Sequence, residues 1–323
     1  MLYINGKVME NIIRTCFVIG LISLGGGLHA QDGAGQFLGS PVSVREIGLP
    51  KEIPARMDFH VVVNAPYSVQ IQGRLREEDP SSKEPAPHWQ GLEADMVRTF
   101  VRWMQRDKQI RLDFDPIFHR DTASLRAAML ADPSQSAGVL VGDEGLEPLK
   151  DSAWLPSLPW LRSGVVLLAP FSDRTAWGNW KAMTQGLDDR NLVLHQSPMT
   201  AAWEKEWNKM ISSRCRTDRV SDESMLWKAL GKKSGITYAI MDAGTASAFL
   251  RQGDFSGWRV RIPGGSSPSV RYLVFPRGSL LRMYWEEFLF SGWGWLNSQE
   301  FQALMDKHLH AGAHSVIKPY PGQ

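Results

Sequence analysis

Residues 59–66 read FHVVVNAP, and residues 91–104 read GLEADMVRTFVRWM. The first stretch is a short β-branched run that ends in turn residues, which predicts a buried strand over residues 59–63. The second stretch places its apolar residues on one helical face, which predicts a helix packed on a sheet. A strand followed by such a helix is the repeating unit of an α/β fold.

The same alternation continues along the chain and predicts mostly parallel sheets. Further strands are expected at residues 110–114, 138–141, 164–169, 191–195, 237–241 and 272–275. Further helices are expected at residues 122–130, 200–211, 222–230 and 242–250, and two more start at Ser279 and Asn297. Thr200 and Asp242 are candidate N-caps. Asn297 and Glu300 have the spacing of a capping box.

Residues 1–30 read as a secretory signal peptide. A basic start precedes the apolar run at residues 16–24, and Ala30 supplies a small residue at the cut. The run is shorter than the roughly 20 residues that a membrane-spanning helix needs. We therefore expect cleavage near Ala30, a periplasmic location, and no stable membrane insertion after cleavage. An uncleaved anchor and a start at Met9 instead of Met1 stay open as alternatives.

The composition of the 323 residues is that of a globular protein, with 43% hydrophobic and 22% charged residues. The chain has 36 Lys and Arg against 34 Asp and Glu. This balance lacks the excess of positive charge that is typical of nucleic-acid-binding proteins. Thirteen Trp residues predict large aromatic surfaces, most of them in the core. If residues 1–30 are removed, Cys215 alone remains, so no internal disulfide is expected.

Four stretches, in this order, resemble the type 2 periplasmic binding proteins, specifically the family 3 extracellular solute-binding proteins typified by polar amino-acid receptors. They read APY at 65–67, GLEADM at 91–96, PSLPWLRSGV at 156–165 and YLVFPRGS at 272–279. The resemblance covers about residues 57–311. It implies an α/β fold of two lobes, joined by two crossover strands near 164–169 and 272–275, with a ligand cleft between the lobes.

The resemblance also implies how the chain divides. The expected parts are a signal peptide at 1–30, a flexible leader at 31–56, lobe one at 57–163 plus 272–311, lobe two at 170–268, and a tail at 312–323.

The family's Arg, which binds the ligand's α-carboxylate as a fork, falls on Lys150 in this sequence, and a family Thr falls on Glu147. Lysine offers a point charge instead of two parallel donors. Glu147 would repel a carboxylate placed there. The resemblance therefore predicts that a standard L-amino acid binds poorly. A solvated surface lysine is the alternative for Lys150.

Two further residues match ligand contacts of the family. Asp242 matches the acidic residue that pairs with the ligand's α-amino group, and Tyr67 matches the aromatic residue that packs over the ligand. Both have structural alternatives, because Asp242 is also a candidate N-cap and Tyr67 a candidate core residue. An amine-bearing or other cationic ligand, or a neutral aromatic one, is expected.

Other candidate ligand contacts follow strand ends. Gly142 ends the strand at 138–141, and Asp143 and Glu144 follow it. With Glu147, these acids either favour a cationic group at the cleft edge or form a solvated turn. Thr200 is the hydroxyl that remains near the position of the family's Gly-Thr-Thr-like turn.

Signatures of catalysis are missing from the sequence. We find no Gly-rich phosphate loop, no paired-carboxylate signature and no nucleophile elbow. His308 and His310 lack the spacing typical of metal ligands on a helix. We expect no catalytic residue, no metal site and no cofactor.

These patterns predict an exported solute-binding protein that captures a small polar or amine-bearing ligand in an interlobe cleft for a membrane ABC transporter. One alternative is an orphan accessory factor or sensor that serves a periplasmic enzyme system. A further alternative is an enzyme similar to cyclohexadienyl dehydratases. The expected partners are a small-molecule ligand and either an ABC permease or a periplasmic enzyme, without nucleic acid.

Overall fold

The structure is a computed structural model. It describes residues 55–63, 66–70, 88–119, 121–131, 137–142, 153–174, 178–187, 190–210, 215–221, 223–231, 237–251, 257–266, 268–292 and 294–320. The chain divides into two compact units, Met1–Gly48 and Leu49–Gln323, and every described residue belongs to the second. The predicted signal peptide and nearly all of the predicted leader therefore lie outside the described residues.

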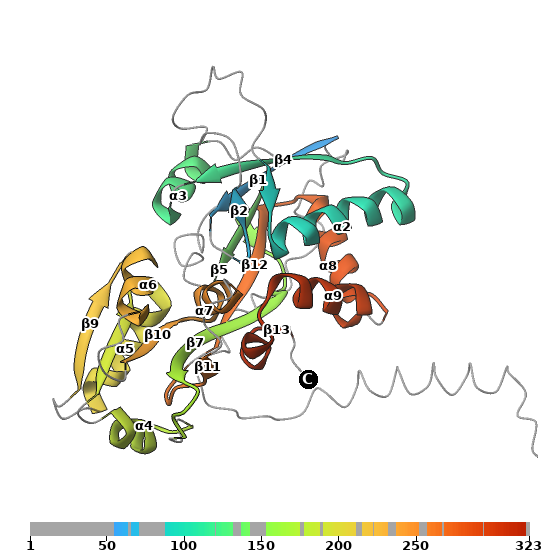
Figure 1. Ribbon diagram of the computed structural model, residues 1–323. Helices are drawn as coiled ribbons and strands as arrows, with labels where there is room; N and C mark the ends of the chain where they lie inside the picture. Colours follow the sequence, from blue (N-terminus) through green and yellow to red (C-terminus); the bar gives the residue numbers. More distant parts are fainter. Residues whose placement is uncertain are drawn as a thin grey trace, which may run out of the picture. The chain divides into compact units, whose positions relative to one another are not determined.

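Strands and helices alternate through the second unit (Figure 1). The strands are β1 (Arg56–Val62), β2 (Val69–Gln70), β3 (Trp89–Gln90), β4 (Asp113–His119), β5 (Ala137–Gly142), β6 (Trp154–Pro156), β7 (Leu161–Pro170), β8 (Asn191–His195), β9 (Arg216–Val220), β10 (Thr237–Asp242), β11 (Trp258–Arg261), β12 (Pro268–Pro276) and β13 (Lys318–Pro319). The helices are α2 (Leu92–Lys108), α3 (Thr122–Ala131), α4 (Trp180–Leu187), α5 (Pro198–Met210), α6 (Glu223–Gly231), α7 (Ala243–Arg251), α8 (Leu280–Phe290) and α9 (Gln299–His308), with 3-10 turns η4 (Trp295–Asn297) and η5 (Ala311–Ser315). None of the helices in these ranges is both long and apolar enough to cross a membrane.

Two groups of parallel strands carry these helices. In the first group β1 pairs in parallel with β4 and β5, and in the second β8 pairs in parallel with β10 and β9. The complete order is β4-β1-β5-β12-β7-β10-β8-β9, with β11 and β13 on β7 and β6 on β12. The alternation of strands and helices predicted from the sequence is confirmed.

Strand β7 joins the two groups. Its first residues, Leu161–Gly164, pair with β12, whereas the residues from Val165 onward pair with β10 and β11. Strand β12 in turn pairs with β5 of the first group. The hydrogen-bonded path is therefore continuous, but β7 changes its partners half-way. This is the behaviour of a crossover strand, and it places the segment predicted at 164–169 where the two groups meet.

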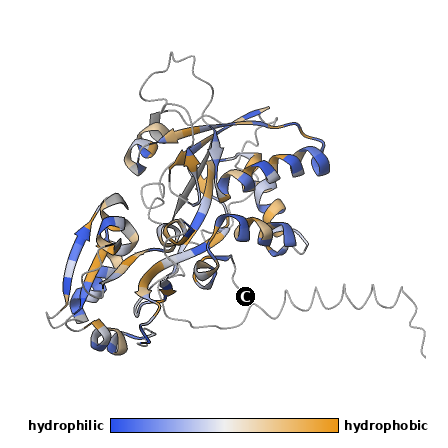
Figure 2. Cartoon of the chain, in the orientation of Figure 1, coloured by the Kyte–Doolittle hydropathy of each residue, from blue (hydrophilic) through white to orange (hydrophobic). Residues whose placement is uncertain are grey.

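Buried strands such as β7 and β8 are mainly apolar, whereas the outer strand β9 is polar (Figure 2). Helix α2 buries Leu92, Met96, Val97, Phe100 and Met104 of the predicted apolar stripe, and its sixth residue, Val101, is partly buried. A smaller cluster lies under α4 and α5, where the Trp203 and Trp207 rings stack with centroids 5.2 Å apart. Both rings are buried, as predicted for most of the tryptophans.

The strand predicted at residues 110–114 was misplaced. Helix α2 runs to Lys108 and ends at Gln109, which takes a left-handed conformation with φ 58°. The strand is β4, which starts later and contains Pro116. Strand β4 lies at one end of the sheet and bonds only to β1 among the described strands. An edge strand tolerates proline because one side of its ladder is unpaired.

Two predicted helix starts were wrong by one or two residues. Helix α5 begins at Pro198, and Ser197 Oγ accepts a hydrogen bond from the Thr200 N–H at 3.2 Å. Proline fits the first turn because its missing N–H is not needed there. At α9 the cap is Ser298, which accepts from the Phe301 N–H at 3.1 Å. Thr200 and Asn297 are therefore not the N-caps of these helices.

The segment expected to be a tail is ordered over residues 312–320. It continues the 3-10 turn η5 and then forms β13, which pairs with Leu161 and Arg162 of β7. The Tyr320 N–H also donates to the Trp160 carbonyl at 3.1 Å. The fold thus extends past residue 311, which was the expected end of lobe one.

Charged side chains connect helix α9 to helix α2 through hydrogen bonds and ion pairs. The Asp95 carboxylate accepts hydrogen bonds from Arg98 Nη1 at 2.9 Å, Lys307 Nζ at 2.6 Å and His308 Nε2 at 2.8 Å. Burial opposes ionisation of Asp95, but these hydrogen bonds together outweigh it and lower the Asp95 pKa from 3.8 to about 2. Burial lowers the pKa of His308.

The depressed pKa of Asp95 predicts an acid-sensitive contribution to stability. This contribution is fully present above pH 4 and is lost as the pH falls towards 2, because the unfolded chain binds the proton first. Between pH 5 and pH 2.5, wild-type protein is expected to lose about 1–2 kcal/mol more than the Asp95→Asn variant. Urea unfolding across this pH range measures the difference. Asp306→Asn, an exposed carboxylate on α9, serves as the control, and equal slopes for wild type and Asp95→Asn would contradict the assignment.

Candidate functional site

Tyr67 and Asp242, which are far apart in the sequence, meet at Gly244. A Cβ atom placed on Gly244 would lie 2.6 Å from Tyr67 Cε2 and 3.1 Å from Asp242 Oδ1. Tyr67 follows β1, and Asp242 ends β10 directly before α7. The two groups of parallel strands thus bring together two of the predicted ligand contacts, and only glycine leaves room between them.

Tyr67 is buried, with 2% of its surface exposed. Its phenol oxygen lies 3.0 Å from Ser163 Oγ of β7, and the Arg271 guanidinium of β12 lies over its ring at 4.5 Å from the centroid. Burial raises the pKa of the Tyr67 phenol well above its usual value, although Arg271 opposes the shift. The phenol is therefore neutral at physiological pH, and its ring is covered by a cation.

A buried ion pair supports this cation. Glu93 Oε1 accepts a hydrogen bond from Arg271 Nε at 2.8 Å and lies 2.5 Å from Arg271 Nη2, and Glu93 Oε2 accepts a hydrogen bond from Ser68 Oγ. Glu93 is 1% exposed and Arg271 is 8% exposed. Buried charges need a partner and hydrogen bonds to be tolerated. The pair fixes Arg271 over Tyr67 and joins α2 to β12.

The Asp242 carboxylate begins helix α7. Its Oδ1 accepts from the Thr245 N–H at 2.8 Å and its Oδ2 accepts from Thr245 Oγ1 at 2.6 Å. The predicted capping role of Asp242 is confirmed. Both donors are neutral groups of Thr245, and the dipole of α7 favours a negative charge at this end of the helix.

Gly142 and Thr200 have different surroundings. Gly142 ends β5 directly opposite Arg271 of β12, which places it beside the same cluster. Thr200 is fully buried, and its hydroxyl donates to the His195 carbonyl at 2.6 Å and accepts from the Ser197 N–H at 2.8 Å. The Thr200 hydroxyl thus stabilises the turn between β8 and α5.

The other predicted contacts, Asp143, Glu147 and Lys150, lie outside the described residues, as does Glu144. Their assignment to the ligand site stays a prediction.

The residues that complete the cluster were missed by sequence reasoning. They are Ser68, Glu93, Ser163, Gly244 and Arg271. Glu93 and Arg271 lie within or beside the stretches that carry the family resemblance, and both interrupt apolar segments. A charged residue in a buried segment needs an opposite charge nearby, so this pair could have been suspected. Its partners could not, since they lie in separate strands and helices.

The cluster has an unbalanced charge. Glu93 and Arg271 neutralise each other, which leaves the Asp242 carboxylate beside the Tyr67 ring. A carboxylate near an aromatic ring is an environment that attracts a cation. Within the ranges that the structure describes, no group of three or more His, Cys, Asp and Glu side chains could hold a metal ion.

Solved structures of other proteins share the fold of this chain. No protein-family model matches the chain, and no curated protein matches its sequence. Solved structures do match. The second substrate binding domain of a Streptococcus pneumoniae protein named for amino acid ABC transport has a TM-score of 0.54 at 14% identity, over 79% of this chain and 100% of that one. Substrate binding domain 2 of Lactococcus lactis GlnP has a TM-score of 0.52 at 13% identity, over 81% and 98%.

The periplasmic VFT2 domain of BvgS from Bordetella pertussis is similar to the same degree, with a TM-score of 0.50 at 15% identity over 79% of this chain and 93% of that one. The chain therefore has the two-lobed α/β fold of type 2 periplasmic binding domains. The fold predicted from the four sequence stretches is confirmed.

Proposed function

We propose that the chain is an exported solute-binding protein that holds a small polar or amine-bearing ligand at the cluster around Asp242 and Tyr67, for delivery to a membrane ABC transporter. The supporting fold is one that other proteins use to bind solutes. The observation that carries the ligand class is the Asp242 carboxylate, which the described residues pair only with the neutral groups of Thr245.

Charge and ring chemistry both favour a cation at this place. The charged side chains that act on Tyr67 are two carboxylates, Glu93 and Asp242, and one guanidinium, Arg271. The Tyr67 ring already accepts Arg271 on one face. A primary ammonium group has three donors, which suit a carboxylate and a nearby carbonyl or hydroxyl. An amine is therefore a better match to this cluster than a carboxylate.

The ligand class is tested by a thermal-shift screen of the protein against the twenty amino acids, polyamines, sugars, aromatic amines and aromatic acids. A ligand at 100 times its Kd raises stability by about 2.7 kcal/mol, which such a screen detects. We expect amines to shift the melting temperature and standard L-amino acids to bind more weakly than about micromolar. Submicromolar binding of an L-amino acid would contradict the proposal.

The site is tested with Asp242→Asn, measured by calorimetry with the amine that the screen finds. Asparagine caps helices about as well as aspartate, so α7 keeps its start while the charge is lost. We expect affinity for the amine to fall by roughly tenfold or more, because a charge-assisted hydrogen bond becomes a neutral one. The melting temperature of the free variant serves as the control for the cap. Unchanged affinity would place the ligand elsewhere.

The second candidate function is that of an orphan accessory factor or sensor for a periplasmic enzyme system. It is favoured by the covered ring of Tyr67, since Arg271 and Gly244 fill the place next to it without a ligand. An enzyme similar to cyclohexadienyl dehydratases is the less favoured alternative, and turnover of prephenate or arogenate would support it. The absence of any hit in the screen, with copurification of a periplasmic enzyme, would favour the accessory role.

A further inference from the structure

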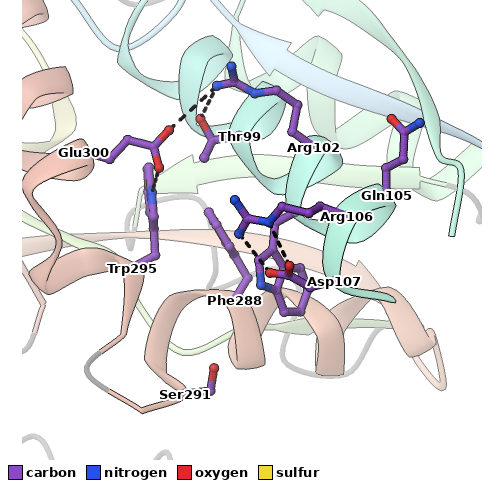
Figure 3. A pocket seen from close by; sticks show the side chains of 10 residues that line it. Thr99, Arg102, Gln105, Arg106, Asp107, Phe288, Ser291, Trp295 and Glu300 are labelled. Carbon is purple, nitrogen blue, oxygen red and sulfur yellow. Dashed lines mark hydrogen bonds and ion pairs between the residues drawn. The ribbon is translucent and has the colours of Figure 1, made fainter. Parts of the chain in front are cut away.

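A cavity lies along the outward face of α2, and neither Asp242 nor Tyr67 lines it. Its volume is about 690 Å³, and it is bordered by α2, α8, η4 and α9 (Figure 3). A neighbouring cavity of about 500 Å³, which shares Arg102, extends it towards Phe114 and Leu304. Cavities of roughly 300–1,000 Å³ are the size that holds a small molecule. We call the first cavity the α2 groove.

One wall of the α2 groove is aromatic. The Phe288 ring stacks on Trp295 with centroids 4.7 Å apart and lies 5.7 Å from the Trp103 ring. The three rings line the groove together. Trp103 and Trp295 are only partly buried, although each already packs on Phe288. Partly exposed aromatic rings beside a cavity offer an apolar body a place to lie flat.

Arg102 lies at the rim of the groove, and most of its N–H groups make no hydrogen bond to the described residues. Its side chain is 71% exposed, and its Nη2 donates to Thr99 Oγ1 at 2.9 Å. The distance from Arg102 Nη2 to Glu300 Oε1 is 3.8 Å, which is too long for a hydrogen bond. A guanidinium has five N–H donors in a planar fork. Thr99 thus orients a fork that can still receive a planar anion.

The other charges of the rim are occupied among themselves. Arg106 donates to both oxygens of Asp107, at 2.7 and 2.9 Å. Glu300 Oε2 accepts from Trp295 Nε1 at 3.0 Å, which holds the indole in place (Figure 3). Together with Arg102, these three charged residues give two positive and two negative charges, so net charge does not select the ligand. The ligand is selected by the Arg102 guanidinium, because this group makes a single hydrogen bond to the described residues and lies next to the aromatic wall.

We propose that the α2 groove is a second binding site, which takes a small aromatic carboxylate. The carboxylate lies on the Arg102 fork in place of the loose contact with Glu300, and the ring lies against Trp103 and Trp295. This ligand class is the opposite of the amine proposed for the cluster at Asp242. The two sites share no residue, so a binding domain of this kind can respond to two solutes.

Calorimetry with 1-naphthoate tests the site, with naphthalene-1-carboxamide as the uncharged probe of the same shape. Arg102→Gln removes the fork. Arg216→Gln is the matched control, because Arg216 is also exposed at 77% and also has one loose carboxylate contact, to Asp218 at 3.5 Å. Asp242→Asn tests whether the two sites are separate. Both arginines are on the surface, so melting temperatures close to wild type are expected for both variants.

We expect saturable binding of 1-naphthoate to wild type, about tenfold weaker binding to Arg102→Gln, and unchanged binding to Arg216→Gln and Asp242→Asn. The carboxamide is expected to bind about tenfold more weakly than the acid. The proposal is overturned by a lack of saturable binding to wild type, by equal affinity of the acid and the amide, or by equal affinity of wild type and Arg102→Gln. Loss of binding in Asp242→Asn alone would also overturn it, since the probe would then occupy the other site.

Discussion

Replacing Glu93 with alanine is expected to lower the free energy of unfolding by about 3–5 kcal/mol. The substitution leaves the Arg271 guanidinium buried without its carboxylate and removes the acceptor of Ser68. A buried charge without a partner is among the largest single penalties in a fold. Urea unfolding at pH 7 measures the loss.

Two further variants show whether the loss of stability in Glu93→Ala comes from the unpaired charge of Arg271. Glu206→Ala removes a carboxylate that is 53% exposed and paired with Lys209, and it is expected to cost no more than about 0.5 kcal/mol. The double variant Glu93→Met with Arg271→Met removes both charges and is expected to be more stable than Glu93→Ala alone. If Glu93→Ala costs less than about 1 kcal/mol, the pair does not hold the cluster together.

Replacing Gly91 with alanine is expected to cost at least about 3 kcal/mol. Gly91 precedes α2 with φ 118° and ψ 178°, a conformation that is essentially confined to glycine. A Cβ at this position would lie 2.3 Å from the Tyr67 carbonyl oxygen. That oxygen accepts from the Glu93 N–H at 2.9 Å, so the clash would push Tyr67 away from the start of α2.

Gly292→Ala is the matched control for this variant. Gly292 also has a positive φ, of 62°, but a Cβ there would meet nothing within 4 Å. The control is therefore expected to cost only the conformational penalty, about 1–2 kcal/mol. Chemical denaturation of both variants measures the difference, and equal losses would show that the approach of Gly91 to Tyr67 has no importance for stability.

The sequence was sufficient to predict the alternation of strands and helices, because a continuous apolar run marks strands such as β8 and the 3.6-residue apolar period marks helix α2. The prediction from sequence failed where the meaning of a residue depends on the position of its strand in the sheet. Pro116 argues against a strand until β4 is known to be an edge. Short polar strands such as β9, Arg216–Val220, carry no such apolar signal and were missed.

The candidate site was predicted only in part. Tyr67 and Asp242 were named from the family resemblance, and the structure places both next to Gly244. The resemblance could not show that Arg271 covers the Tyr67 ring, because that contact joins residues from two distant parts of the chain. Nor could it show that the Thr200 hydroxyl donates to the His195 carbonyl, since that contact belongs to the turn between β8 and α5.

The most direct measurement of the central claim is a crystal structure of the protein with the amine that the thermal-shift screen finds. The account predicts difference density for the ammonium group within hydrogen-bonding distance of an Asp242 carboxylate oxygen, with the ligand beside Tyr67 and Gly244. Density for the amine in the α2 groove, or anywhere out of reach of Asp242, would contradict it.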